Sequence, residues 1–369
     1  AYSLDSYQDG ELAQIGPPAA VQEPFTAQDL RFITRYRLTW RDALNGVGET
    51  LYYEGLIFLL ILLVIPLPGV LLLLVEHAYR VDHATGPAGD RGEPWDPAAW
   101  WGAALALGVA AWPVLWTWLT MVGARWTGWL LAGVVVAGWL CALFYWWHER
   151  SARRAANESG DIFPRPPIAA SWRWDHLVLL GILLLGLAVR LVAARDTPVL
   201  PWVDASRHAL ITAVMARSGQ TISDYAPLLP VDRFPYHFGF HTLSSTLQML
   251  SGWPLERLLL YLGQLFNALV PLTMFSAVWL LVGRRRAGYL AAFLVALPFF
   301  FPAYYATWGR LTQLTAVLLL PILIAFTWQL IRGGQVWIDR WWLLGILAAG
   351  LFLIHFRVFA YYLPFPILT

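Results

Sequence analysis

Residues 198–252 read PVLPWVDASRHALITAVMARSGQTISDYAPLLPVDRFPYHFGFHTLSSTLQMLSG, and apolar segments lie on both sides of them. The acidic, basic and histidine side chains of this stretch are Asp204, Arg207, His208, Arg217, Asp224, Asp232, Arg233, His237 and His241. Because the rest of the chain is mostly apolar, this stretch is where polar chemistry can be assembled. We therefore predict an active-site loop at a membrane surface.

The composition is that of a polytopic membrane protein. Of the 369 residues, 59% are hydrophobic and only 13% are charged, and the mean hydropathy is +0.56. Soluble domains carry about twice that charged fraction. Several apolar runs reach the ~20 residues needed to cross a bilayer core. The formal net charge of +2 gives no reason to expect nucleic acid as a partner, and the single Cys141 excludes a disulfide framework within the chain.

Two parts follow from the apolar pattern. Residues 1–54 form a polar appendage, in which Phe25–Leu44 is either an amphipathic helix at the membrane surface or a solvated helix. Residues 55–369 form an all-α transmembrane bundle of about eight spans. The expected spans are Leu56–Val75, Ala98–Val122, Thr127–Trp147, His176–Ala193, Leu258–Val282, Ala287–Phe301, Leu311–Ile331 and Trp341–His355. The chain begins without Met, so we expect it to be part of a longer protein.

Arginine placement in the short loops sets the orientation. The segment HERSARR (148–154) and the cluster Arg284–Arg286 should both be cytoplasmic. The loop 194–257 is then external, together with residues 302–310 and the end of the last span. Within this loop, Phe238–Leu250 has 13 residues, too few to cross comfortably, so we predict a helix lying in the membrane interface.

Asp204 is the first candidate for chemistry, and two interpretations of it stay open. Aspartate is a good N-cap, and Ala205–Arg217 is expected to be a short helix, so Asp204 is a helix cap in one interpretation. In the other it is a carboxylate just above the membrane that acts as a general base or a metal ligand.

Further polar residues surround Asp204 in sequence or in the expected topology. Arg207 and His208 follow it by one helical turn, and His237 and His241 are four residues apart. That spacing occurs in metal sites, but Gly239 weakens the helix and no HExxH glutamate is present, so no metal ligand is assigned. Trp308, Arg310 and Arg357 lie in other external segments. Arginine suits phosphate through its planar fork, and tryptophan stacks on sugar rings; interfacial snorkelling is the alternative for each of them.

The order of these motifs resembles GT-C membrane glycosyltransferases. A span is followed by an external W-x-D and a short helix with a glycine exit (Trp202, Asp204, Gly219). PWVDASRH, YAPLLPVD, YHFGFH, LGQLFNAL and YYATWGRLTQL are similar, in that order, to uncharacterised bacterial multi-pass proteins of GT-C type, over roughly Pro66–Leu330. The resemblance departs at YHFGFH, where many relatives have Pro-Pro-Leu-Tyr, and at Ala205, where many have a second acidic residue.

The resemblance implies transfer of a sugar from a polyprenyl-phosphate donor to an acceptor at the outer face of a bacterial cytoplasmic membrane. Asp204 is then the catalytic carboxylate. Arg207, His208, Asp232, His237, His241, Trp308, Arg310 and Arg357 are the substrate-binding candidates. No cofactor is assigned, although a divalent metal is compatible if Asp224 or Asp232 supplies a second acid. The implied partners are the lipid-linked donor, membrane lipid and other membrane proteins, without nucleic acid.

Two other classes of function compete with this one. A non-catalytic membrane subunit of a larger assembly would use Asp204 only as a helix cap, without a cavity in front of it. A transporter would bury charges near the bilayer midplane, and the expected spans hold few Asp, Glu or Arg.

Overall fold

The computed structural model describes residues 7–8, 11–12, 39–83, 95–159, 173–195, 197, 200, 203–224, 236–297, 302–332 and 340–368. The chain divides into two compact units, residues 1–45 and 46–369. In the first unit, β1 (Tyr7–Gln8) pairs with β2 (Glu11–Leu12) in antiparallel register. Most of the predicted helix Phe25–Leu44 lies outside the described residues; only its last turn is seen, in the start of α1.

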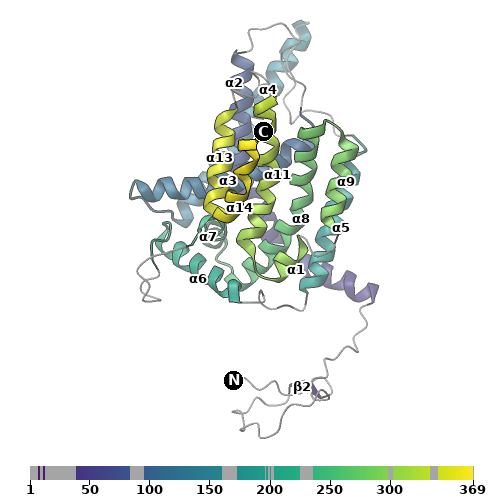
Figure 1. Cartoon of the computed structure of the whole chain (residues 1–369), viewed down its shortest axis with the longest axis vertical. Helices are drawn as coiled ribbons and strands as arrows, with labels where there is room; N and C mark the ends of the chain where they lie inside the picture. Colours follow the sequence, from purple (N-terminus) through teal and green to yellow (C-terminus); the bar gives the residue numbers. More distant parts are fainter. Residues whose placement is uncertain are drawn as a thin grey trace. The chain divides into compact units, whose positions relative to one another are not determined.

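The second unit is a bundle of helices (Figure 1), so the prediction of an all-α bundle is confirmed. Its described helices are α1 (Trp40–Val64), α2 (Leu67–His83), α3 (Pro97–Met121), α4 (Gly128–Ser159), α5 (His176–Ala194), α6 (Val203–Ser218), α7 (Gly239–Ser251), α8 (Leu255–Val282), α9 (Arg285–Ala296), α10 (Ala303–Thr307), α11 (Leu311–Arg332), α13 (Trp341–Ile354), α14 (Phe356–Tyr362) and α15 (Pro364–Leu368).

Six segments of the described residues are long and apolar enough to cross a membrane, which makes this an integral membrane protein. They are α1 with α2 (Trp40–Tyr79), α3, α4 as far as Ala152, α5, α8 and α11. Trp341–Ile354 and Phe356–Leu368 are shorter apolar helical stretches. The expected span Ala287–Phe301 is represented by α9, a helix of 12 residues.

The first span is interrupted at Ile65 and Pro66, near the middle of the expected span Leu56–Val75. Proline has no N–H to donate, so carbonyls at the end of α1 lose their helical partners. Two indoles replace them: Trp112 Nε1 donates to the Val64 carbonyl at 3.1 Å, and Trp139 Nε1 donates to the Leu63 carbonyl at 3.0 Å. The break is therefore satisfied inside the protein, as a lipid environment requires.

Small residues allow the central helices to approach closely. A side chain at Gly102 of α3 would place its Cβ 2.0 Å from Ser276 Oγ of α8. A Cβ at Gly350 of α13 would lie 2.4 Å from Ala110 Cα of α3. Packing through small residues is the usual way in which membrane helices associate, because lipid provides no hydrophobic driving force between them. Helices α3 and α8 consequently form the centre, with α2, α5, α9, α11 and α13 around them.

Helix α7 lies inside the protein. It has 13 residues, about 20 Å, and Gly239–Leu247 are all buried. Its neighbours are α3, α4, α6, α8, α11 and α13, so most of its surface packs against other helices. That α7 lies along the membrane interface stays a prediction. Its Ser and Thr side chains serve contacts between helices: Trp116 Nε1 donates to Thr246 Oγ1 at 2.9 Å, and Ser244 Oγ lies 2.8 Å from Thr212 Oγ1 of α6.

Candidate functional site

Asp204 lies in the first turn of α6, not at the cap position that the sequence suggested, because the helix already begins at Val203. Its side chain is partly exposed, and it forms no hydrogen bond with any residue that the structure describes. A carboxylate in a first helical turn is favoured by the helix dipole. The nearest identified electrostatic partner is His208, one turn further along the same face.

Helix α6 ends where the sequence predicted, at a glycine exit. Gly219 has a positive φ of 66°, and its amide donates to the Met215 carbonyl at 2.8 Å. A Cβ there would lie 2.1 Å from the Trp126 carbonyl oxygen. Glycine is thus required for two reasons: the positive φ disfavours other residues, and there is no room for a Cβ beside the Trp126 carbonyl. This exit fixes the far end of the helix that carries Asp204 and His208.

His208 of α6 and His241 of α7 form a buried pair. His208 Nδ1 lies 2.9 Å from His241 Nε2, and the two residues are 2% and 0% exposed. Burial lowers the pKa of His208 to about 4, although Asp204 and a hydrogen bond to the Gly309 backbone act in the other direction. Burial likewise lowers the pKa of His241 well below its ordinary value. Both rings are therefore neutral at pH 7. In the hydrogen bond between them, one ring donates its N–H and the other accepts with the lone pair of its nitrogen.

His237 and His355 extend this pair to a cluster of four histidines. The His237 ring stacks on Tyr236 with centroids 3.8 Å apart and lies 4.5 Å from the His355 ring. Burial is the main cause that lowers the pKa of His237 to about 3 and that of His355 to about 4. His355 Nδ1 accepts from the Val358 amide at 3.3 Å, which leaves Nε2 to carry the proton of the neutral ring.

Three ring nitrogens of this cluster are available for a ligand: Nδ1 of His241 and both nitrogens of His237. Both Nδ1 and Nε2 of His237 are buried and have no hydrogen-bond partner among the described residues. Such groups are costly unless something satisfies them. A neutral imidazole offers one donor and one acceptor. It therefore suits a hydroxyl group or a mixed polar ligand, and it does not act as a cation.

Arg310 reaches the cluster from the loop between α10 and α11. Its guanidinium carbon lies 3.9 Å above the centre of the Trp308 ring, and its buried Nε has no partner among the described residues. The charges of Arg310 and Arg357 both oppose protonation of His355. Arg357, on α14, acts on His237 in the same direction. Both arginines thus bring positive charge to the histidine cluster.

The loop that carries Arg310 is held by a buried polar chain. Arg190 Nε of α5 donates to Asn267 Oδ1 of α8 at 2.9 Å. The Asn267 amide then donates to the Pro302 carbonyl at 3.1 Å, just before α10. Arg190 is only 4% exposed. The buried cation therefore fixes the segment that presents Trp308 and Arg310.

The structure brings together His208, His237 and His241, with the segments of Trp308, Arg310 and Arg357 beside them. Arg207 is exposed on α6. Asp232 lies outside the described residues. His355 was not among the predicted site residues; its position next to Arg357 at the end of an apolar helix was the available signal. Among the described residues, no three His, Cys, Asp or Glu side chains are placed to hold a metal ion.

Comparison with models of protein families, with curated proteins and with solved structures finds no match for this chain.

Proposed function

We propose that this protein transfers a sugar from a polyprenyl-phosphate-linked donor to an acceptor hydroxyl at the non-cytoplasmic face of the bacterial cytoplasmic membrane. One arrangement supports the proposal: the charges of Asp204, Arg310 and Arg357 act on a cluster of buried histidines, in which His208 Nδ1 lies 2.9 Å from His241 Nε2 and the rings of His237 and His355 are 4.5 Å apart. Cations suit the phosphate, neutral imidazoles suit sugar hydroxyls, and the carboxylate suits proton removal.

In the proposed reaction Asp204 accepts the proton of the acceptor hydroxyl, whose oxygen attacks the anomeric carbon of the donor sugar. A new glycosidic C–O bond forms as the bond between that carbon and the phosphate oxygen breaks. The lipid phosphate leaves with an additional negative charge. Arg310 and Arg357 stabilise that charge where it develops, which is the most effective place for an electrostatic catalyst.

The histidines have a separate task in this proposal. His237 presents a donor and an acceptor without partners, as sugar hydroxyls require. Its low pKa keeps it neutral beside the arginines, so it does not compete with them for the phosphate. His208 joins this group to Asp204, since it lies one turn from the carboxylate and is bonded to His241.

The test is sugar transfer by the purified protein in nanodiscs, with a panel of polyprenyl-phosphate sugars as donors. Arg310→Ala should lower kcat/KM by at least tenfold, and Arg310→Lys should recover only part of it, because the planar fork is lost. Arg332→Ala is the matched control: Arg332 lies at the other end of α11 and stacks on Trp328 at 4.1 Å, just as Arg310 stacks on Trp308. Transfer unaffected by Arg310→Ala would contradict the role of Arg310, and no transfer by the wild-type protein from any donor of the panel would favour a non-catalytic membrane subunit.

A further inference from the structure

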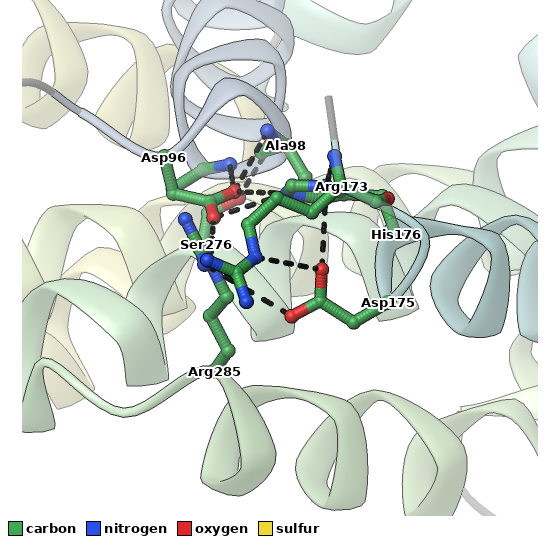
Figure 2. A network of polar contacts seen from close by, with 8 residues as sticks. Asp96, Ala98, Arg173, Asp175, His176, Ser276 and Arg285 are labelled. Carbon is green, nitrogen blue, oxygen red and sulfur yellow. Dashed lines mark hydrogen bonds and ion pairs between the residues drawn. The ribbon is translucent and has the colours of Figure 1, made fainter. Parts of the chain in front are cut away.

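A second polar cluster lies at the opposite end of α5 (Figure 2). Asp96 caps the start of α3 and accepts from the amides of Ala98 and Ala99 at 2.9 and 3.4 Å. His176, the first residue of α5, takes its own capping bond at Nδ1 from the Arg173 amide at 2.9 Å. Its Nε2 therefore carries the proton and donates to both Asp96 oxygens at 3.1 Å. Arg285, at the start of α9, pairs with the same carboxylate.

This cluster carries an excess of positive charge at the protein surface. Asp175 lies between two arginines, 3.5 Å from Arg173 Nε and 3.9 Å from Arg285 Nη1. Two further arginines, Arg284 and Arg286, flank Arg285 in the chain and are exposed. The four arginines therefore carry more positive charge than the two aspartates, Asp96 and Asp175, can neutralise. The Arg173 side chain is 64% exposed, so its charge is accessible to an anion.

An apolar crevice of about 630 Å³ opens directly beside the cluster. Its walls come from the break between α1 and α2, from α3, from α5 and from α8. Leu62, Trp101, Leu105, Leu180, Leu183 and Leu272 are among the side chains that line it. Arg173, Trp174 and His176 line it too, at the start of α5. The crevice is thus apolar along its length and cationic at one end.

The surroundings of the crevice indicate what fills it. Each of its four walls belongs to a segment that is long and apolar enough to cross the membrane. Leu177 and Leu180 on α5 are 54% and 49% exposed in the protein, so they face lipid. Trp174 is 88% exposed at the end of the same helix, the usual place for tryptophan among headgroups. An acyl chain suits these walls, and a phosphate suits the arginines.

We infer that this crevice is a binding site for an anionic phospholipid, whose acyl chain lies between α3, α5 and α8 and whose phosphate binds Arg173 and the neighbouring Arg284 and Arg286. Basic pockets between membrane helices recognise anionic headgroups in this way. The site is distinct from the proposed transfer site, because the 19 residues of α5 separate the two ends by about 28 Å. It does not depend on the proposed function.

Native mass spectrometry of the purified protein tests this inference. Delipidated protein is titrated with phosphatidylglycerol and with phosphatidylcholine of the same acyl chains. We expect tighter binding of the anionic lipid, and Arg173→Gln should weaken that binding about fivefold, the typical effect of one basic residue near an anionic headgroup. Inorganic phosphate at equal concentration should not displace the lipid, because it lacks the acyl chain.

A second pair of variants tests the apolar part. Leu180→Trp should obstruct the crevice and reduce binding of both lipids, whereas Leu184→Trp should leave binding unchanged. Leu184 is 57% exposed on the same helix and does not line the crevice. Equal binding of the two lipids by the wild type, or undiminished binding by both Arg173→Gln and Leu180→Trp with thermal stability near wild type, would overturn the inference. So would a dimer whose formation excludes lipid from the crevice.

Discussion

Replacement of Asp96 should be among the most destabilising single changes in this protein. The Asp96 side chain is fully buried and has four partners: two amides at the start of α3, His176 Nε2 and Arg285. Asp96→Ala removes the cap, worth about 1 kcal/mol. It also leaves a guanidinium and an imidazole without their acceptor. Breaking a buried pair by removing one partner costs roughly 3–5 kcal/mol, and the partial exposure of Arg285 places the pair at the lower end of that range.

These terms act on one side chain and are not additive, so we expect a total loss of about 3–5 kcal/mol for Asp96→Ala. Asp96→Asn keeps an oxygen for the amides and should lose about half as much, since only the charge-assisted part disappears. In a chain of this length the alanine change corresponds to a fall in Tm of roughly 4–6 °C. Intrinsic fluorescence or a thiol-independent dye assay in detergent measures it.

The matched control is Asp42→Ala. Asp42 also occupies a first helical turn and forms a reciprocal capping box with Thr39, through bonds of 3.0 and 3.2 Å, but it is only partly buried, whereas Asp96 is fully buried. Its loss should cost only about 1 kcal/mol. A Tm for Asp96→Ala within 2 °C of that of Asp42→Ala would refute the argument that buried charge dominates at this site.

Three further predictions concern packing, charge and pH. Gly219→Ala should destabilise by at least 1 kcal/mol more than Gly252→Ala: both have a φ of 66°, but only the former has an atom within 4 Å of its Cβ position. Arg340→Met should lower Tm because it removes the guanidinium that pairs with buried Glu76 at 2.7 Å, and Glu76→Gln in the same chain should restore part of the loss. Equal Tm for the single and double variants would contradict this. Burial lowers the pKa of His208 from 6.5 to about 4. As the pH falls below 6.5, the unfolded chain therefore binds a proton at this histidine before the folded protein does. The free energy of unfolding should decrease by about 1.4 kcal/mol per pH unit between pH 6.5 and pH 4. His208→Gln should flatten the dependence of Tm on pH, and an unchanged slope would contradict this assignment.

The sequence was sufficient for much of the fold because hydropathy and helix punctuation are local signals. The break at Pro66 and the helix exit at Gly219 could be read from single residues. The place of α7 could not, because its Ser and Thr residues are equally compatible with a wet surface and with a buried interface between helices. Only the packing shows that they bond to neighbouring helices, such as Thr246 to Trp116.

Long-range contacts explain what the sequence missed around the sites. His208 and His241 were both candidates, but their pairing joins residues 33 apart through the packing of α6 on α7. His355 received no assigned role, since a histidine at the end of an apolar helix has no distinctive pattern. The Asp96 cluster was also missed, although Asp96 followed by Pro97 is a recognisable helix start. Its partner Arg285 is 189 residues away in the chain.

The most direct measurement of the central claim is the rate of sugar transfer by Asp204→Asn, from a polyprenyl-phosphate donor to acceptor in nanodiscs. Asparagine keeps the size of the side chain and removes the proton acceptor, so kcat should fall by roughly 10²–10⁴-fold while Tm stays near that of the wild type. Glu256→Gln is the control, since Glu256 is an exposed carboxylate in the first turn of α8, and it should retain full activity. Wild-type turnover by Asp204→Asn would contradict the assignment of Asp204 as the catalytic base.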